Sequence, residues 1–235
     1  DSEPALAPAG LLEEYGCEDA RVTALEGRYY ITYVTPSRHG IATSLAVTAD
    51  FRGFRREGVM FLADHKDVAL FPERLGGRYW ALTRPMPASF AKVHGVWLSC
   101  SPDLACWGGH QPLALPRPGR WDSKRTGGSC VPLRTEAGWL VLYHGVDQAN
   151  RYCMGGLLLD GDDPRRVLAR SPQPILAPEA AYERAGFYGN VVLSCGAVAL
   201  DARGERLRLY YGAADAVTAA ADFAVEEILA SLRPE

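Results

Sequence analysis

The chain lacks the long apolar runs and paired cysteines that mark several large classes of protein. No run of about 18 apolar residues occurs among its 235 residues, so the sequence predicts no transmembrane helix. Residues 1–10 have neither the basic nor the apolar region of a signal peptide. No C-x-x-C pair occurs, so we expect no zinc site and no bound metal. We interpret the scattered cysteines as reduced thiols of a cytoplasmic protein, namely Cys17, Cys100, Cys106, Cys130, Cys153 and Cys195.

The chain also has little net charge and none of the common nucleotide-binding motifs. A formal net charge of −3 implies no general attraction to nucleic acid or to an anionic membrane. The glycine-rich motifs of P-loop and dinucleotide-binding proteins are absent, as is the G-x-S-x-G motif of serine hydrolases. With 48% apolar and 23% charged residues, the composition is that of an ordinary soluble globular protein.

Short aromatic and β-branched runs dominate the chain, and four of them resemble one another. The four runs begin at Gly27 (GRYYITYV), Gly77 (GRYWALTR), Gly138 (GWLVLYHG) and Arg206 (RLRLYYGAAD), so they start 50, 61 and 68 residues apart. Each follows a turn that contains glycine and charge. An all-β unit that recurs at this spacing is typical of a propeller blade, so we predict a single β-propeller domain over residues 1–235.

A second strand follows three of these runs, and proline-rich segments separate the repeats. We expect the second strands at 41–50, 96–104 and 152–160, with hairpin turns at 48–54 and 101–107. The proline-rich stretches 113–121 and 170–179 are interpreted as connections between blades. Only residues 219–232 have helical spacing, and they are expected to form a short C-terminal helix or coil whose apolar face carries Phe223, Ile228, Leu229 and Leu232.

Polar residues recur in each repeat, and a propeller would bring them together around its axis. Arg84, His144 and Asp215 follow the aromatic runs at similar positions in three repeats, which predicts a polar axial cleft. Glu18 and Asp19 are neighbours near a strand, where side chains alternate, so only one of them is expected to face the cleft. The full set that the repeats contribute is Glu18, Asp19, His65, Lys66, Asp67, Arg84, Lys124, His144, Asn190 and Asp215.

This set of residues fits an anionic substrate beside a proton donor. Arginine offers a planar fork to phosphate oxygens, lysine offers a point charge, and a carboxylic acid can protonate a glycosidic oxygen. Tyr152 has the aromatic face and hydroxyl that hold sugars. Each residue also has a structural interpretation, which the residues alone leave open. These interpretations are an ion pair of a carboxylate with Arg21, a surface pair at Lys66, a braced turn at Arg84, loop charge at Lys124, a core histidine at His144 and a turn cap at Asp215.

The order of motifs along the chain resembles glycoside hydrolase family 130, the β-mannoside phosphorylases and related mannosidases. The motifs that carry the resemblance are EDAR at 18–21, HKDVALFPE at 65–73, GGRYWALTRP at 76–85, WDSKRTGG at 121–128, GWLVLYHG at 138–145 and LYYGAAD at 209–215. The resemblance implies a five-bladed β-propeller. Because only four copies are found, we expect the first blade to precede residue 1 or to have been lost. Ala20 stands where proline is common in the family.

The resemblance also implies an inverting phosphorylase in which inorganic phosphate attacks a terminal β-mannosyl unit and releases α-mannose 1-phosphate. Asp19 would be the acid, acting through a mannose hydroxyl. The anionic phosphate needs no second carboxylate as a base, so the cleft is expected to be basic. By the same resemblance Lys66, Arg84, Lys124 and His144 would hold phosphate. The sugars would contact Glu18, Asp67, Tyr152, Asn190 and Asp215. Phosphate is then a co-substrate, and no cofactor is expected.

Two other functions remain open from the sequence. An inverting β-mannosidase of the same fold would need a carboxylate base, for which Asp67 and Glu73 are near. A non-catalytic propeller would bind sugar without turnover. The expected partners are a β-mannoside oligosaccharide and phosphate, without nucleic acid or membrane, and the sequence is compatible with a homo-oligomer. It leaves open whether the linkage is β-1,4 or β-1,2.

Overall fold

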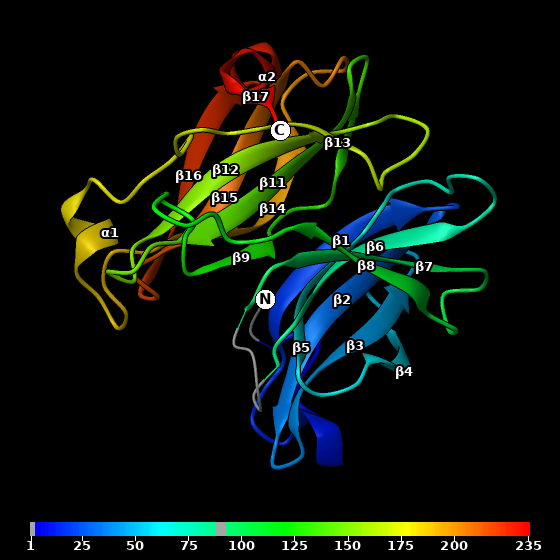
Figure 1. Ribbon diagram of the computed structural model, residues 1–235. Coiled ribbons are helices and arrows are strands. Elements are labelled where there is room, and N and C mark those ends of the chain that lie inside the picture. The colour runs from blue at the N-terminus through cyan, green and yellow to red at the C-terminus, as the bar shows by residue number, and fades with distance from the viewer. Residues whose placement is uncertain (1–2, 88–92) are drawn as a thin grey trace.

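Four antiparallel sheets follow one another along the chain (Figure 1). The computed structural model describes residues 3–87 and 93–235. The first sheet contains β1 (Glu18–Leu25), β2 (Arg28–Ser37), β3 (Gly40–Thr48) and β4 (Arg55–Phe61). The second contains β5 (His65–Leu70), β6 (Tyr79–Pro85), β7 (Val96–Ser101) and β8 (Gly108–Ala114).

The third and fourth sheets complete the arrangement and occupy the upper half of Figure 1. The third sheet contains β9 (Arg125–Gly128), β10 (Leu133–Thr135), β11 (Gly138–Val146), β12 (Tyr152–Leu159), β13 (Val167–Arg170) and β17 (Arg233–Pro234). The fourth contains β14 (Val192–Ala199), β15 (Arg206–Ala213) and β16 (Val217–Ala224). The helical segments are short, namely η1 (Leu11–Glu13), α1 (Ala181–Arg184) and α2 (Val225–Ser231).

The repeat predicted from the sequence is confirmed, because its four runs form β2, β6, β11 and β15, one in each sheet. Segments 96–104 and 152–160 contain β7 and β12, and segment 41–50 contains all of β3 except Gly40. The two proline-rich stretches begin at the ends of β8 and β13 and run between successive sheets. The architecture is therefore all-β and propeller-like, with four sheets among the described residues. No helix in the described part of the chain is long and apolar enough to cross a membrane.

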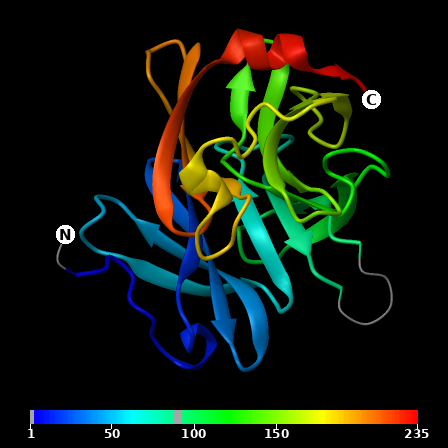
Figure 2. The same ribbon diagram turned by 90° about the vertical axis from the view of Figure 1, so that its left-hand side faces the viewer.

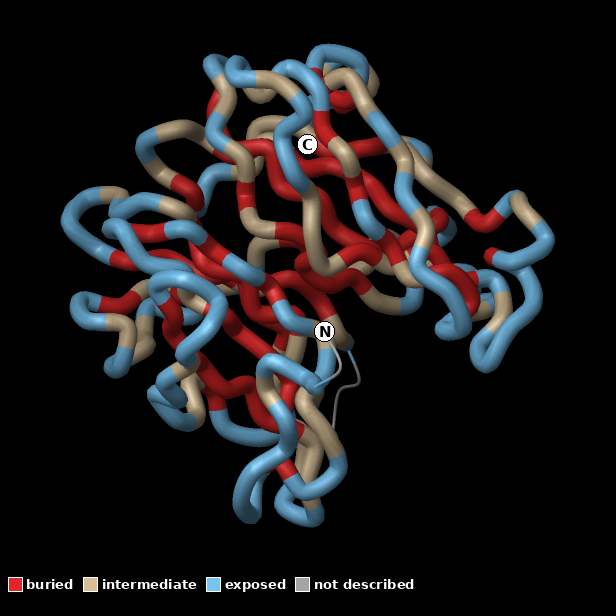
Figure 3. Tube along the Cα trace, turned by 180° about the vertical axis from the view of Figure 1, so that it is seen from behind, coloured by how far each residue is buried: buried red, intermediate tan, exposed pale blue. Residues whose placement is uncertain are grey.

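Apolar side chains hold the sheets face to face, and β11 shows how. All nine residues of β11 are buried. Trp139, Val141 and Tyr143 pack toward the second sheet, in one cluster with Leu82 and Leu98. The alternate residues Leu140 and Leu142 pack toward the fourth sheet, in one cluster with Val192, Leu207 and Leu209. Because β11 is covered on both faces, its residues 138–143 form a continuous apolar run ahead of His144. Figure 3 shows this buried centre beneath exposed loops.

The junction between the fourth and first sheets differs from the others. An open groove of about 600 Å³ lies between β1 of the first sheet and β14–β15 of the fourth. Its lining includes Val22, Val198 and Tyr210, whose exposed fractions are 44%, 48% and 45%. Large apolar side chains are thus left open to solvent at the one sheet-to-sheet junction where the described residues form no apolar cluster.

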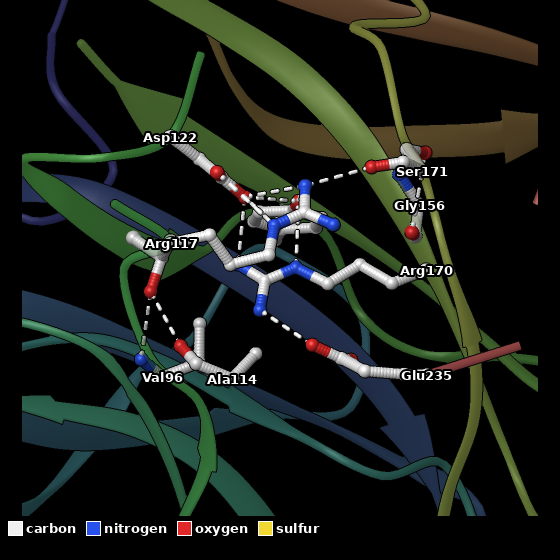
Figure 4. Close-up of polar contacts among 10 residues, drawn as sticks. Val96, Ala114, Arg117, Asp122, Gly156, Arg170, Ser171 and Glu235 are labelled. Atoms are coloured by element: carbon white, nitrogen blue, oxygen red, sulfur yellow. Dashed lines mark hydrogen bonds and ion pairs between the residues drawn. The ribbon is translucent and has the colours of Figure 1, made fainter. Parts of the chain in front are cut away.

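A buried ionic network fixes the connection between the second and third sheets (Figure 4). The Asp122 carboxylate accepts hydrogen bonds from Arg117 at 2.8 Å, from Arg170 at 2.7 Å and from the Tyr143 hydroxyl at 2.8 Å. Arg170 also contacts Glu235 near the end of the chain, at 3.2 Å. Three donors compensate the buried charge of Asp122, so the connection enters β9 at a fixed position.

The C-terminal helix is shorter than the sequence predicts. Residues 219–224, which include Phe223, belong to β16, and α2 begins only at Val225. Strand β16 pairs with β15 over eight residue pairs, and this pairing overrides the local helical spacing. Ile228 and Leu232 are buried in the same cluster as the cores of the third and fourth sheets. Figure 2 shows α2 lying across one end of these two sheets.

Candidate functional site

A cleft of about 420 Å³ opens where the first strands of the sheets meet. Eight of the ten residues proposed from the sequence as ligands or catalyst line it, so the prediction that the repeats converge holds for most of the set. The lining residues are Glu18, Asp19, Lys66, Asp67, Arg84, His144, Tyr152, Tyr188, Val191, Leu193 and Asp215.

The innermost strands β1 and β5 present their carboxylates through the same irregularity. Glu18 pairs with Val34 and Lys66 pairs with Arg84, and in both strands the register shifts at the next residues. Asp19 and Asp67 therefore occupy matching positions, with φ of 51° and 55°. This left-handed conformation breaks the alternation of side chains. The expectation that only one of Glu18 and Asp19 faces the cleft is wrong for this reason, since both line it.

Asp19 presents its carboxylate to the cleft while its backbone is held from behind. The carboxylate lies 3.3 Å from the Lys66 ammonium, and about a quarter of the Asp19 side chain is exposed, at 27%. The Asp19 carbonyl accepts a hydrogen bond of 2.6 Å from Arg21. Across the cleft, burial and the neighbouring charge of Asp19 raise the pKa of Asp215. Asp215, which faces Asp19 in the cleft, therefore retains its proton more readily than an ordinary carboxyl group.

Asp67 is the buried centre of the cationic side of the cleft. Only 3% of its side chain is exposed, and Arg84 Nε lies 2.5 Å from one of its oxygens. Arg21 lies 3.3 Å from the other oxygen, and His144 Nε2 lies 3.6 Å from the first. Burial alone would raise the pKa of Asp67, but the charge of Arg84, the charge of His144 when it is protonated in acid, and the charge of Arg21 outweigh it and hold this pKa well below the usual range. Both oxygens face cations, so Asp67 is placed to orient Arg84.

Arg21 joins three sheets behind the cleft. Its exposed fraction is 1%, and its guanidinium donates to the carbonyls of Ser129 at 3.1 Å and of Gly128 at 3.3 Å. From the sequence, an ion pair between Arg21 and a neighbouring carboxylate was one possible interpretation. The structure instead pairs it with Asp67, which is 46 positions away. This guanidinium uses its fork of donors to fix β1 against β5 and β9.

His144 is packed as a neutral imidazole against Asp67. Burial lowers its pKa to about 4, although the charge of Asp67 acts in the opposite direction. Its ring lies 6.0 Å from that of Tyr152, between centroids. Gly127 makes this packing possible, because a Cβ atom there would lie 2.2 Å from Asp67 Oδ2 and 2.4 Å from His144 Cε1. Glycine is the one residue that fits this approach.

Arg84 and Arg125 are two guanidinium groups at the cleft that have unused donors among the described residues. Arg84 uses Nε on Asp67, and no partner for its two terminal nitrogens is found within residues 3–87 and 93–235. The Arg125 guanidinium carbon lies 5.2 Å from the centroid of the Tyr152 ring at the edge of the cleft. Its Nε is buried and has no hydrogen-bond partner in the described part of the chain. A bound anion would satisfy such donors.

Two residues of the predicted set are not in the cleft. Lys124 is exposed and donates a hydrogen bond to the side chain of Asn150. The sequence placed Lys124 in the site, whereas it is its neighbour Arg125 that approaches the cleft, against the ring of Tyr152. Adjacent side chains at the start of a strand point to opposite sides. Asn190 is exposed, and it contributes its backbone oxygen, which accepts a hydrogen bond of 3.0 Å from the Tyr152 amide.

Two further expectations need correction. Arg84 and His144 lie near the ends of β6 and β11, the corresponding strands of the second and third sheets, but Asp215 lies in the turn beyond β15, so only two of the three share a position. The cleft is mixed in charge rather than basic, since the carboxylates of Glu18, Asp19 and Asp215 also line it. The described residues contain no group of three or more side chains arranged to hold a metal ion.

The fold and the site together define an all-β, propeller-like protein with a charged cleft at the meeting point of its sheets. A family model described as β-1,4-mannooligosaccharide phosphorylase matches residues 1–233. The chain belongs to glycoside hydrolase family 130.

Several relatives in this family are well matched. A β-1,2-mannobiose phosphorylase of Listeria innocua is 44% identical over all 235 residues, which cover 65% of that protein. A 1,2-β-oligomannan phosphorylase of a Thermoanaerobacter species is 36% identical over 216 residues, covering 91% of this chain and 70% of that protein. The solved complex of the Listeria innocua enzyme with β-1,2-mannobiose superposes with a TM-score of 0.94 at 44% identity, covering 98% of this chain and 64% of that one. The chain thus spans a little less than two thirds of the Listeria relative.

Proposed function

We propose that this protein is an inverting glycoside phosphorylase that cleaves terminal β-linked mannosides with inorganic phosphate. The observation that carries the proposal is the presence, in one cleft, of an accessible carboxyl group at Asp19 and the guanidinium donors of Arg84. Arg125 adds a second guanidinium at the edge of the cleft, against the ring of Tyr152. Two relatives with 44% and 36% identity are named for β-1,2-linked mannosides, which favours that linkage over β-1,4.

The reaction follows from this arrangement. Phosphate is held by the terminal nitrogens of Arg84, with Arg125 and Lys66 balancing its charge, and His144 beside it. A phosphate oxygen forms a bond to the anomeric carbon as the bond from that carbon to the glycosidic oxygen breaks. Asp19 supplies a proton to the departing oxygen, through a mannose hydroxyl as the family resemblance implies. The products are α-mannose 1-phosphate and a shortened saccharide, and the anomeric configuration is inverted.

The burial of Asp67 argues for phosphorolysis over hydrolysis at this position. A hydrolase of this fold needs a carboxylate base that activates water, and the sequence offered Asp67 and Glu73 for that role. Asp67 is paired to Arg84 and Arg21, and Glu73 is not among the lining residues. The hydrolase remains the second candidate because Asp215 is a further carboxylate in the cleft. We assign Asp215, Glu18 and Tyr152 to the sugar.

The test is an assay of β-1,2-mannobiose with and without inorganic phosphate, followed by ³¹P and ¹H NMR. We expect α-mannose 1-phosphate only when phosphate is present, and no product from Asp19→Asn. Release of free mannose without phosphate would establish the hydrolase instead. Sugar binding by the wild-type protein without either product would establish a non-catalytic sugar-binding propeller.

A fifth sheet is part of this proposal. Elsewhere neighbouring sheets pack through apolar clusters, whereas the groove between the fourth and first sheets leaves Val22, Val198 and Tyr210 open. The longer relatives have the chain length for another sheet. In the protein as its gene encodes it, Val198→Asp should then lower the melting temperature, whereas Leu11→Asp, at an exposed site outside the groove, should not. Equal effects of the two substitutions would refute the fifth sheet.

The free cysteines support a cytoplasmic location. All six lack a disulfide partner, which is the usual state of thiols in a reducing compartment. Cysteine-specific labelling of the protein inside intact cells tests this, and disulfide-linked forms would contradict it.

A further inference from the structure

A second pocket, larger than the cleft, lies on the opposite face of the second sheet. Its volume is about 720 Å³, and we call it the β4–β8 pocket because its lining runs from β4 to β8. Lys66 and Arg84 form a directly opposed pair whose side chains reach the cleft, and the next pair, His65 and Pro85, lines the pocket. Successive pairs of an antiparallel ladder face opposite sides, so β5 and β6 separate the two sites. The other lining residues used below are Phe61, Asp64, Thr83, Trp97, Ser99, Trp107 and His110.

Aromatic rings form one wall of the β4–β8 pocket. The ring of Phe61 is stacked on His65 at 4.8 Å between centroids and lies 5.5 Å from Trp107. Trp97 and Trp107 are both only partly buried, so their surfaces remain available to a ligand. Flat apolar faces of this kind are suited to the C–H face of a sugar ring.

The pocket also contains a buried hydroxyl without a hydrogen-bond partner. The exposed fraction of Thr83 is 1%, and its Oγ1 has no partner among the described residues. Thr83 pairs directly with Trp97 across β6 and β7, so the two side chains share the face that lines the pocket. An unpaired buried hydroxyl is costly, and a ligand that carries hydroxyl groups would satisfy it. Nearby, Ser99 Oγ lies 2.8 Å from His110 Nδ1 and fixes that ring.

The described lining residues of the pocket offer no cation to an anionic ligand. No lysine or arginine occurs among its lining residues in the described chain. Burial lowers the pKa of His65 to about 4, so this histidine is neutral at pH 7. The carboxylate of Asp64 is the charged group, and one of its oxygens accepts a hydrogen bond of 2.9 Å from the Ile41 amide. A neutral polyhydroxylated ligand fits the described lining.

We propose that the β4–β8 pocket is a second saccharide site, which binds a neutral mannoside of one or two sugar units separately from the cleft. Its volume falls in the range of small-molecule sites, about 300–1,000 Å³. Trp97 and Trp107 provide the stacking surface, and Thr83 provides the hydroxyl that binds a sugar oxygen. The inference rests on the proposed function for the kind of sugar, but not for the existence of the site.

Fluorine NMR of the intact protein labelled with 5-fluorotryptophan tests the proposal, with β-1,2-mannobiose as the probe and no phosphate present. The cleft lining contains no tryptophan, so tryptophan signals report on the pocket. We expect the resonances of Trp97 and Trp107, identified with Trp97→Phe and Trp107→Phe, to shift saturably, while those of Trp80, Trp121 and Trp139 stay in place. A cleft variant such as Asp19→Asn should leave these shifts unchanged.

Thr83→Val is the decisive variant, because it removes the unpaired hydroxyl and leaves a side chain of similar shape. One lost hydrogen bond should weaken mannobiose binding in the pocket by about fivefold to tenfold, with turnover unaffected. Unchanged resonances at tens of millimolar sugar, or shifts that Thr83→Val does not weaken, would overturn the inference. Phosphate-dependent turnover without tryptophan shifts overturns the pocket alone. Saturable shifts in a protein without turnover support the pocket and remove the proposed function.

Discussion

Replacing Asp67 by asparagine is the perturbation whose size the structure defines best. The side chain keeps its shape but loses the charge that faces Arg84 at 2.5 Å, Arg21 at 3.3 Å and His144 at 3.6 Å. Arg21 and Arg84 are themselves buried, with exposed fractions of 1% and 6%. Removal of one partner from a buried ionic group costs about 3–5 kcal/mol. In a protein of this length that corresponds to a fall in melting temperature of roughly 6–20 °C.

The same substitution should change how stability depends on pH. The pKa of Asp67 is depressed in the folded state, so its ionised form stabilises the wild type above the unfolded value of about 3.9. That contribution is lost as the pH falls through the folded value. The difference in free energy of unfolding between wild type and Asp67→Asn should therefore be constant above about pH 5 and narrow below about pH 4.

Urea unfolding monitored by tryptophan fluorescence at several pH values measures this difference. Asp222→Asn is the matched control, because it removes a carboxylate paired with Arg208 at 2.7 Å on the exposed surface of the fourth sheet. The control should unfold close to the wild type. Asp67→Asn with wild-type stability at pH 7, or with a deficit that does not narrow in acid, would refute the role of Asp67 as the buried centre of the site.

Two further predictions concern the cleft. Gly127→Ala places a methyl group 2.2 Å from Asp67 Oδ2, so it should lower kcat/KM by about tenfold or more and cost about 1–3 kcal/mol of stability. Gly53→Ala, which meets no atom within 4 Å, is its control in the same kinetic and unfolding assays. Burial and the charge of Asp19 raise the pKa of Asp215 in the folded protein. Ionisation of Asp215 therefore lowers the stability of the folded protein as the pH rises through this raised pKa. Asp215→Asn should therefore have the melting temperature of the wild type in acid and a higher melting temperature at pH 7, and it should lose mannoside turnover. A lower melting temperature than the wild type at pH 7 would contradict this prediction.

The repeating architecture was accessible from the sequence because each repeat carries its own local signal. In β2 and β6, for example, a glycine-containing turn is followed by a short run of mostly aromatic and apolar residues, and both features can be read from the sequence alone. The convergence of Lys66, Arg84 and His144 followed from the propeller symmetry alone. The helical spacing of residues 219–224 gave a wrong prediction, because these residues pair with β15, and this pairing cannot be read from their own local pattern.

The orientation of individual side chains was not accessible in the same way. Nothing in the local sequence distinguishes Lys124 from Arg125, and the choice depends on which of two neighbours the ladder between β9 and β11 turns inward. The left-handed backbone at Asp19 is likewise a consequence of a register shift against β2. The burial of Asp67 depends on Arg21, which comes from another sheet.

The Michaelis constant for phosphate in single-residue variants tests the central claim most directly, because that claim is the placement of the anion in the cleft. Loss of one charge-assisted contact costs about 1.5–3 kcal/mol, so Arg84→Ala and Arg125→Ala should raise the KM for phosphate by roughly 10-fold to 100-fold. Lys124→Ala, next in sequence but directed away from the cleft, should change it less than about twofold. The account would be contradicted if Lys124→Ala and Arg125→Ala raised the KM for phosphate equally, or if Arg84→Ala left this KM unchanged.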